Sequence, residues 1–201
     1  MKIFYIGDLH FGHNNIIKYD DRPFLNVQEM DMSLINNWNS VVTDEDKVII
    51  LGDFTMSGDV NYWCSLLGVL NGTKCICIGN HDNRKCLHNP DVSKHFEWIK
   101  ETMEIVDGNR RVIVGHYPNF WHKKSYDKNY FSLYAHVHTT IEWEDCKRLQ
   151  KQLANRASQN PDPNRVLPLG QVYNVGCMMP FMNFTPRTLD EIVKGYCNYY
   201  A

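Results

Sequence analysis

A short apolar run that ends in a small residue and is followed by a polar one occurs five times in this chain of 201 residues. Such continuous runs, rich in valine and isoleucine, are typical of strands buried on both faces. The glycine or alanine at the end of each run lets the backbone pass close to a neighbour. The runs are 2–7 before Asp8, 48–52 before Asp53, 75–79 before Asn80 and His81, 112–115 before His116, and 131–135 before His136.

Helical periodicity fills the intervals between these strands. Apolar residues at helical spacing predict helices over 26–42, 59–70 and 93–106. Asn26 and Glu29 form a possible cap pair at the start of the first helix. Alternation of strands and helices favours a largely parallel sheet covered by helices. Because open sheets of this kind bind ligands at the carboxyl ends of their strands, we expect the polar residues at the strand ends to meet in one site.

The C-terminal third of the chain is less regular. We predict a helix over 144–157, an exposed loop over 158–168, where three prolines occur, and a strand over 171–175. The residues 188–191 form a capping box that opens a final helix. No internal repeat and no long linker divides the sequence. Residues 1–201 are therefore expected to form one domain.

Composition argues against several classes of function. The 21 lysines and arginines and the 23 aspartates and glutamates give a net charge of −2. The chain therefore lacks the excess of positive charge that is typical of nucleic-acid-binding proteins. No apolar run reaches the roughly 18 residues of a transmembrane helix, and the apolar residues 3–6 are too few for a signal-peptide core. The seven cysteines contain no CxxC pair and suit a reducing compartment. We expect a cytoplasmic protein with no membrane partner.

The polar residues at the strand ends are of the types that bind metal ions. Asp8 and His10 are two positions apart, so on an extended segment they face the same side and can hold one ion. The same holds for His136 and His138. Carboxylate oxygen and imidazole nitrogen without thiolate suit Zn, Mn, Fe or Co. The seven candidate ligands are Asp8, His10, Asp53, Asn80, His116, His136 and His138. They exceed the about four to six ligands of one ion, but two ions that share a carboxylate would use them all.

Five short motifs carry these residues in a characteristic order. They are Gly7-Asp8-Leu9-His10, Gly52-Asp53, Gly79-Asn80-His81-Asp82, Gly115-His116 and His136-Val137-His138. Their order and strand context resemble those of the calcineurin-like metallophosphoesterases, over residues 3 to about 140, and the small bacterial or phage-type phosphoesterases most of all. The resemblance implies an α/β sandwich in which two β-sheets, built from βαβ units, are flanked by helices.

The resemblance also implies a role for each residue of the motifs. The first of two divalent transition-metal ions (Mn, Fe, Zn, Co or Ni) would be held by Asp8, His10, Asp53 and His138. The second would be held by Asp53, Asn80, His116 and His136. Asp53 would bridge the two ions, and His81 would be the uncoordinated catalytic histidine.

The implied activity is hydrolysis of small phosphomonoesters or phosphodiesters. Two ions about 3.5–4 Å apart clamp the attacking and leaving oxygens, and a water that bridges them becomes a hydroxide nucleophile near neutral pH. His81 would supply the proton that the departing alkoxide needs. Protein phosphatases of the family have Asp and Arg where this chain has Met56 and Ser57. A protein substrate is therefore not expected, and the residue that orients His81 is unassigned.

Four further residues have a functional and a plain structural interpretation. His13, Arg22 and Arg84 are candidate contacts of the substrate phosphate, whereas a solvated loop histidine and surface ion pairs explain them equally simply. Asp82 is a candidate support for the ligands or a turn residue. The aromatic stretch 117–121 either lines a substrate pocket or packs in the core.

The expected partner is a small-molecule phosphate ester, and two rival functions stay open. A non-catalytic scaffold of the same fold would bind a protein. Such scaffolds tend to lose the catalytic histidine or several ligands, whereas this chain keeps them all. A nuclease would need a basic groove, and the DNA-repair nucleases of the family carry a capping domain for which 201 residues leave no room.

Overall fold

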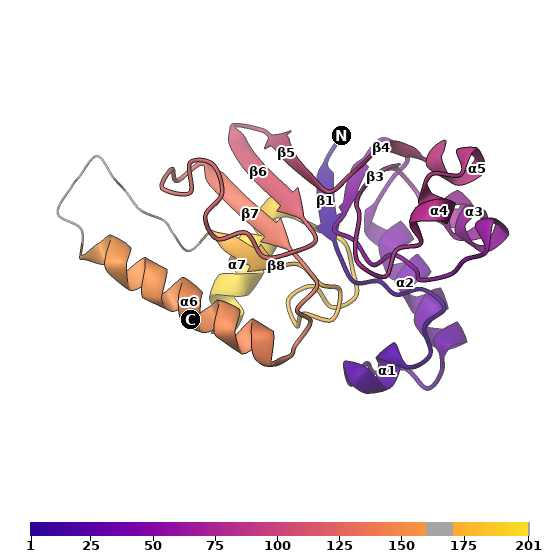
Figure 1. Ribbon diagram of the computed structural model, residues 1–201, viewed down its shortest axis with the longest axis horizontal. Helices are drawn as coiled ribbons and strands as arrows, with labels where there is room; N and C mark the ends of the chain where they lie inside the picture. The colour runs from indigo at the N-terminus through magenta and orange to yellow at the C-terminus, as the bar shows by residue number, and fades with distance from the viewer. Residues whose placement is uncertain (160–170, 201) are drawn as a thin grey trace.

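The computed structural model describes residues 1–159 and 171–200, and its strands form two sheets (Figure 1). The five-stranded sheet contains, in spatial order, β4 (Phe96–Lys100), β3 (Thr73–Cys77), β2 (Lys47–Ile50), β1 (Ile3–Ile6) and β9 (Arg187–Thr188). The four-stranded sheet contains β5 (Thr102–Asp107), β6 (Arg110–Gly115), β7 (Tyr130–Tyr134) and β8 (Val172–Asn174). The predicted α/β architecture of two sheets flanked by helices is confirmed.

Both sheets have a parallel centre and an antiparallel edge. Strands β1 to β4 run parallel, and β9 is antiparallel to β1. Strands β6 to β8 run parallel, and β5 forms an antiparallel hairpin with β6. The strands β1, β2 and β3 are buried over nearly their whole length. This double burial explains why their sequences are continuous apolar runs rather than alternating ones.

The helices flank the sheets on the outside. They are α1 (Ile16–Tyr19), α2 (Val27–Val41), α3 (Val60–Val69), α4 (Arg84–Leu87), α5 (Pro90–Ser93), α6 (Ile141–Ser158) and α7 (Leu189–Tyr200). In Figure 1, α2 to α5 lie beside the five-stranded sheet and α6 lies beside the four-stranded one, whereas α7 contacts strands of both sheets, β1, β8 and β9. The buried face of α2 carries Met30, Leu34 and Trp38, and the Asn26 side chain caps it by accepting from the Glu29 N–H (2.9 Å). The helices predicted over the two first intervals are confirmed as α2 and α3.

The helix predicted over 93–106 is wrong. Most of the segment forms β4 and β5, joined through Glu101. Met103 and Val106, expected on a buried helical face, are 40% and 55% exposed. The residues match helical spacing, but they are rich in β-branched and aromatic types, and the strands β3 and β6 offer open edges to pair with. Pairing in the sheet outweighs the local pattern.

The elements of the C-terminal third occur close to their predicted places. The helix predicted over 144–157 is α6, and the strand predicted over 171–175 is β8. In the capping box before α7, the N–H of Thr188 donates to Glu191 Oε2 (2.8 Å) and the Glu191 N–H to Thr188 Oγ1 (3.4 Å). Residues 160–168 of the predicted loop lie outside the described residues. Within 1–159 and 171–200, no helix has the length and apolarity needed to span a bilayer.

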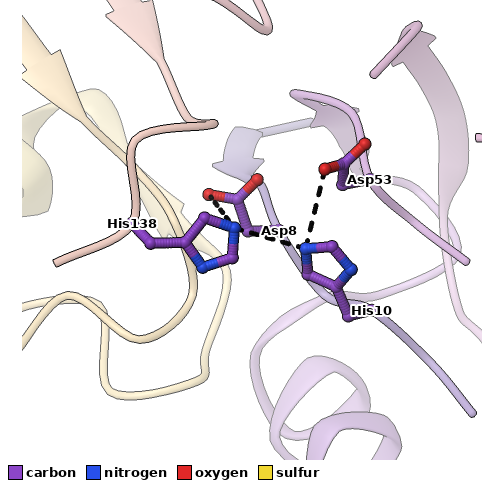
Figure 2. Close-up of side chains that lie close together, drawn as sticks. All are labelled: Asp8, His10, Asp53 and His138. Carbon is purple, nitrogen blue, oxygen red and sulfur yellow. Dashed lines mark hydrogen bonds and ion pairs between the residues drawn. The ribbon is translucent and has the colours of Figure 1, made fainter. Parts of the chain in front are cut away.

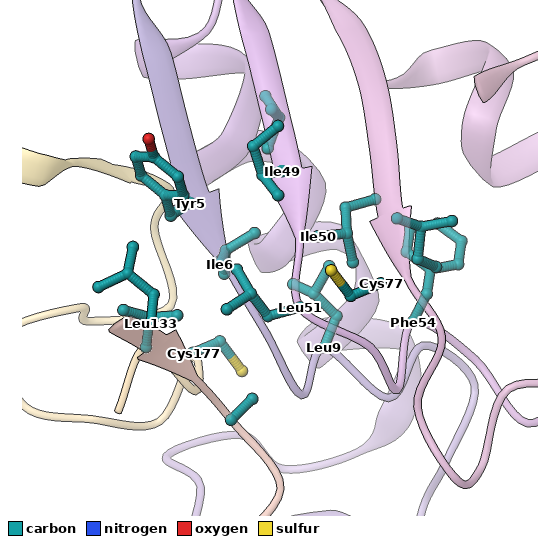
Figure 3. Packing of buried hydrophobic residues seen from close by; sticks show 14 of the residues in the cluster. Tyr5, Ile6, Leu9, Ile49, Ile50, Leu51, Phe54, Cys77, Leu133 and Cys177 are labelled. Atoms are coloured by element: carbon teal, nitrogen blue, oxygen red, sulfur yellow. The ribbon is translucent and has the colours of Figure 1, made fainter. Parts of the chain in front are cut away.

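The hydrophobic core is continuous from one sheet to the other (Figure 3). Tyr5 and Ile6 of β1, Ile49 of β2 and Leu133 of β7 are all buried in one cluster with Cys177. A core of this extent stabilises the chain without help from a bound ion. It also provides a rigid base for the loops at the strand ends.

The two sheets meet at the carboxyl end of β1. Gly7 and Gly176 form a parallel bridge, in which the Gly7 N–H donates to the carbonyl oxygen of Val175 (2.9 Å) and the Cys177 N–H donates to that of Gly7 (2.8 Å). A Cβ atom at Gly7 would lie 2.5 Å from the Cβ of Ala135. Glycine is therefore required for this approach. The junction brings the strand-end residues of both sheets to one place.

Candidate metal centre

Four side chains converge at this junction (Figure 2). Asp8 and His10 belong to the loop after β1, Asp53 to the loop after β2, and His138 to the loop after β7. Each offers one ligand atom, and these atoms all lie within 4.8 Å of one another. The structure thus brings together the four residues that the motifs assign to the first ion.

The donor atoms of this group point at a common space. His10 Nε2 and His138 Nε2 lie 3.3 Å apart. His10 Nε2 lies 3.6 Å from Asp53 Oδ2, and His138 Nε2 lies 3.9 Å from Asp8 Oδ2. Burial lowers the pKa of His10 to about 3, so its ring is neutral and has a lone pair to offer. Two imidazoles and two carboxylates in this arrangement fit a divalent cation.

A second group adjoins the first through Asp53. Its Oδ2 atom lies 3.6 Å from His10 Nε2 and 3.5 Å from His116 Nε2, so one oxygen lies between histidines of both groups. His116 Nε2 lies 2.9 Å from Asn80 Oδ1. The ring of His136 packs on that of His116 with centroids 5.0 Å apart. The residues assigned to a second ion are therefore close together, with Asp53 in common.

Hydrogen bonds on the far side of the rings orient two of these histidines. Nδ1 of His116 donates to the carbonyl oxygen of Leu51 (2.7 Å), and Nδ1 of His138 donates to Asp20 (2.8 Å). When a cation displaces the proton from Nε2, the hydrogen bond at Nδ1 leaves the Nε2 lone pair of each ring directed at the site. Histidines that bind metals are commonly fixed by a hydrogen bond of this kind.

The electrostatics of the two groups favour a cation. Burial opposes ionisation of Asp53, but the hydrogen bond and charge of His116 outweigh it and lower the pKa of Asp53 to about 2. Burial also opposes protonation of His116, but Asp53 and Asp8 outweigh it and raise the pKa of His116 to about 9. Asp8 is fully buried, which raises its pKa. Two buried carboxylates at one place need positive charge beside them.

The ligand loops share an unusual backbone conformation. The φ angle is positive, between 47° and 68°, at Asp8, His10, Asp53, His136 and His138. For residues other than glycine this left-handed region costs on the order of 1–3 kcal/mol each. The conformation therefore has to be held by the surrounding contacts. Strain of this kind clusters at functional sites, and the spacing of the motifs does not predict it.

Asp82 lies behind the loops after β2 and β3. Its carboxylate accepts three backbone hydrogen bonds, from the N–H groups of Asp53 (3.0 Å), Phe54 (2.8 Å) and Gly79 (2.8 Å). Burial raises the pKa of Asp82 to about 6, although these hydrogen bonds act in the opposite direction. The carboxylate therefore ties the loop of Asp53 to the loop that carries Asn80.

Asp20 and Arg22, from the loop after α1, hold the first group from behind. Arg22 is buried, pairs with Asp20 (2.8 Å) and donates to the carbonyl oxygens of Asp8 (2.8 Å) and Leu9 (2.9 Å). Its donors face the protein, which differs from the phosphate contact expected of Arg22. Sequence reasoning missed Asp20 because it follows no strand. The two aspartates that directly precede Arg22 are the signal in the sequence that could have drawn attention to it.

Sequence reasoning also missed two residues that follow or end β8. The Asn174 side chain donates to the carbonyl oxygen of His138 (3.1 Å), and the Cys177 thiol lies 3.1 Å from the carbonyl oxygen of Asp8. Asn174 lies inside the predicted strand and is not preceded by a small residue, so the rule that identified the candidate ligands does not select it. Cys177 follows Gly176, as the candidate ligands follow a small residue, but carboxylate, amide and imidazole side chains were the ones considered at the strand ends.

The other candidate contacts occupy different places around the site. His81 is exposed, with its ring centroid 5.5 Å from that of His10. His13 is partly buried, and its centroid lies 5.7 Å from the same ring. Arg84 is exposed on α4 and pairs with Glu101 (2.7 Å). The structure therefore brings His13 and His81 beside the first group and engages Arg84 in a surface ion pair.

The aromatic stretch 117–121 divides between its two interpretations. Tyr117 is 53% exposed, and its ring lies 4.5 Å from that of His136. Phe120 is buried in the core, whereas Trp121 is 71% exposed. One residue of the stretch is thus in contact with a candidate ligand, and one is part of the packing.

Comparison with known proteins identifies the class to which this site belongs. The sequence pattern of the calcineurin-like phosphoesterases (Metallophos) matches residues 1–175. The match covers most of the chain, and the chain belongs to the calcineurin-like phosphoesterase family. The fold and the cluster of Asp8, His10, Asp53 and His138 agree with metal binding in this family.

Individual relatives extend this result. The chain is 44% identical to the "Uncharacterized protein MJ1445" of Methanocaldococcus jannaschii, over 96% of this chain and 90% of that protein. It is 29% identical to the "Gene 66 protein" of Mycobacterium phage L5, over 62% of this chain and 67% of that protein. A protein of unknown function from Aquifex aeolicus, AQ665, has a crystal structure with a TM-score of 0.60 and 20% identity, covering 96% of this chain and 98% of that one. That likeness shows the fold alone.

Proposed function

We propose that this protein is a dinuclear metal-dependent phosphoesterase. The observation that carries the proposal is the position of Asp53 Oδ2, 3.6 Å from His10 Nε2 and 3.5 Å from His116 Nε2. One carboxylate between two groups of ligands suits two ions that share it. When bound, two ions chosen from Mn, Fe, Zn, Co and Ni would supply Lewis-acid charge for the phosphoryl oxygens and acidify a water.

The ligands divide into two sets in this proposal. The first set is Asp8, His10, Asp53 and His138. The second set is Asp53, Asn80, His116 and His136. Arg22 and Asp20 keep the first set in position from behind, and Asp82 keeps the loops of the second set together. The inward-facing donors of Arg22 support this positioning role in place of a phosphate contact.

His81 is the general acid in this proposal. Its side chain is exposed beside His10, so it can meet a substrate that arrives from solvent. Imidazole is the side chain most often used for proton transfer near neutral pH. His81 holds a proton toward the ester oxygen of the leaving alcohol and donates it as the bond to phosphorus breaks. His13, on the other side of His10, contacts a phosphoryl oxygen.

The proposed substrate is a small-molecule phosphate ester, either a monoester or a diester. The net charge of −2 supports such a substrate over nucleic acid. All seven cysteines are free thiols, which supports a reducing, cytoplasmic setting.

Elemental analysis of the purified protein and three variants tests the dinuclear proposal. We expect two ions per chain in the wild type, loss of both in Asp53→Asn, and loss of one ion each in His10→Ala and His116→Ala. The exposed Asp44→Asn serves as a control with the same change of charge and should keep both ions. One ion at saturation in a fully active enzyme, or two tightly held ions in Asp53→Asn, would contradict the proposal.

A substrate panel separates the proposal from its rivals. Phosphomonoesters, cyclic nucleotides, phosphodiesters and single-stranded DNA are assayed with each of the five metals in turn. We expect hydrolysis of small esters and its loss on addition of a chelator. Two bound ions without hydrolysis of any compound would favour a binding scaffold. Preference for DNA over every small ester would favour a nuclease.

A further inference from the structure

A pocket of about 590 Å³ lies against the loops that carry His10 and Asp53, and the proposed mechanism leaves it unused. Its walls are the loops that follow His10 and Asp53 and the amino-terminal halves of α2 and α3. The two loops run side by side, because the His10 N–H donates to the carbonyl oxygen of Asp53 and the Phe11 N–H to that of Phe54, each at 2.9 Å. The pocket is thus a direct continuation of the two ligand loops.

Apolar surface and two carboxylates, of which that of Asp31 is partly buried, give this pocket its character. Phe11, Val27 and Met56 line it, and Met56 is 46% exposed. Asp31, on α2, is partly buried in the same lining and accepts a hydrogen bond from the Tyr62 hydroxyl (2.9 Å). A ligand with an aromatic ring or a short aliphatic chain, and with a polar group at its end, would match this combination.

Backbone geometry holds Asp31 in place. The Gly12 N–H lies 3.1 and 3.2 Å from the two carboxylate oxygens of Asp31. Gly12 has a φ of 75°, and a Cβ atom there would lie 2.8 Å from the Tyr62 hydroxyl oxygen. Glycine is therefore required for the loop to close on Asp31 and Tyr62. Two oxygens with about four lone pairs retain capacity for a further donor.

The charge of the pocket excludes the phosphate itself. Its charged lining residues are Asp31 and Asp59, and no lysine or arginine of the described residues lines it. An anion would be repelled, so the phosphoryl group belongs at the metal centre and the organic part of the ester in the pocket. Met56 stands three residues after Asp53, where protein phosphatases of the family have an acidic residue. An apolar side chain at this point suits a small organic group.

We propose that this pocket binds the alcohol portion of the substrate. It selects an aliphatic or aromatic group that carries a hydrogen-bond donor at its end, best a cationic amine. The donor is recognised by the carboxylate of Asp31. The inference rests on the proposed phosphoesterase function and names the class of ester that the site prefers. A carboxylate at the same end of the alcohol is disfavoured, because it would face Asp31 without a counter-charge.

Three aryl phosphates test this selection at constant leaving-group chemistry. They are the phosphate esters of tyramine, 4-propylphenol and 3-(4-hydroxyphenyl)propanoate, which differ at the chain end by an ammonium, a methyl and a carboxylate. With the Mn²⁺-loaded protein we expect kcat/KM for the ammonium ester to exceed that for the carboxylate ester by about tenfold or more. Equal kcat/KM for the three esters would overturn the proposal.

Two variants locate the selection in the pocket. Asp31→Asn should bring the ratio of the ammonium to the carboxylate ester close to one. Met56→Lys places a positive charge in the lining of the pocket and should shift the ratio toward the carboxylate ester. Because Met56 is exposed, this substitution should not disturb the fold. Met103→Lys, a similarly exposed methionine on β5, and Asp44→Asn are the matched controls and should keep the wild-type ratio. Ratios unchanged by both pocket variants would overturn the proposal.

A binding measurement keeps the pocket separate from the catalytic proposal. Tyramine and 3-(4-hydroxyphenyl)propanoate are titrated into the Zn²⁺-loaded protein, and the amide resonance of Gly12, which reports on Asp31, is followed by NMR. We expect a shift with tyramine that Asp31→Asn abolishes, and little with the propanoate. If no ester is hydrolysed but this shift occurs, the phosphoesterase proposal fails and the pocket stands. If Gly12 does not respond to tyramine, the pocket assignment fails whether or not the esters are hydrolysed.

Discussion

His81 combines exposure with closeness to the candidate ligands, so its contribution should depend on the leaving group. An alkyl phosphate expels an alkoxide that needs a proton, and a general acid is worth roughly 10²–10⁴-fold for such a step. A p-nitrophenyl ester expels a stabilised anion that leaves without help. We expect His81→Ala to reduce kcat/KM for the alkyl ester by roughly 10²-fold or more and that for the nitrophenyl ester far less.

Metal content measured in the same preparations serves as the control for this variant. His81→Ala should retain both ions. Equal losses on the two esters would reject the role of His81 as an acid, and a rise in KM shared by both would point to a phosphate contact. Loss of an ion would show that His81 is a ligand.

Asp20 acts on the site through His138 and not through the substrate. Its carboxylate accepts the Nδ1 proton of His138 and so keeps Nε2 directed at the first group. Loss of such a hydrogen bond typically weakens metal binding by about 10–100-fold. We expect Asp20→Asn to weaken the first ion by this factor in a chelator competition and to leave the second unchanged. Asp21→Asn, at the exposed neighbouring position, is the control, and equal effects of the two would contradict the assignment.

The sequence predicts single residues well where a strand delivers them. Asp8, Asp53 and His116 each follow an apolar run, and parallel strands bring their carboxyl ends to one edge. Asp20 comes from a loop, and its partner His138 is far away in the sequence. The contact between them therefore cannot be predicted from the local sequence pattern. The left-handed backbone of the ligand residues is likewise a result of tertiary contacts.

At the scale of elements, Asp46 connects the start of β1 to the turn before β2. Its carboxylate accepts from the Lys2 N–H (2.7 Å) and from the Thr43 N–H (3.0 Å) and hydroxyl (2.7 Å). These hydrogen bonds lower the pKa of Asp46 from its ordinary 3.8 to about 2. A pKa that is depressed in the folded state stabilises the fold above about pH 4, and the gain is lost as the pH falls through about 2.

Substitution of Asp46 therefore has a pH-dependent cost. We expect Asp46→Asn to lower the free energy of unfolding by about 1–3 kcal/mol at pH 7. The difference from the wild type should shrink below about pH 4. Urea unfolding at pH 7, 5, 4 and 3 measures it, and Asp44→Asn in the same turn should show little effect at any pH. A difference that is constant with pH would mean that the carboxylate charge is not involved.

Most elements could be predicted from local pattern because that pattern agrees with their packing. The stripe of Met30, Leu34 and Trp38 faces the core in α2 as its spacing predicts. The segment 93–106 could not be predicted in this way, because its periodicity is compatible with a helix and its partners in β3 and β6 are not adjacent in the sequence. What decided its conformation was the availability of open sheet edges.

At the scale of the whole molecule, the fold should survive removal of metal. The core is continuous across both sheets and contains no ligand that its packing depends on. A metal that binds the folded state alone stabilises it by about 2.7 kcal/mol at 100 times its Kd. We expect chelation to leave the far-ultraviolet circular dichroism spectrum unchanged and to lower the Tm by roughly 5–10 °C.

The same thermal transition tests the organisation of the chain. That residues 1–201 form one domain stays a prediction, and a single transition in which calorimetric and van't Hoff enthalpies agree would support it. Loss of native circular dichroism on chelation would contradict a metal-independent fold. Two separate transitions would contradict the single domain.

The bridge between Gly7 and Gly176 has a consequence for how the protein is made. Cys177 packs against Asp8 although the two residues are 169 positions apart in the sequence. A nascent chain therefore carries its first ligands through the synthesis of all the residues between them without the surroundings that hold these ligands in place. The metal centre can reach its native arrangement only after the segment 174–177 has been made, so a chain cut short before residue 172 should be unable to take up its ions in that arrangement.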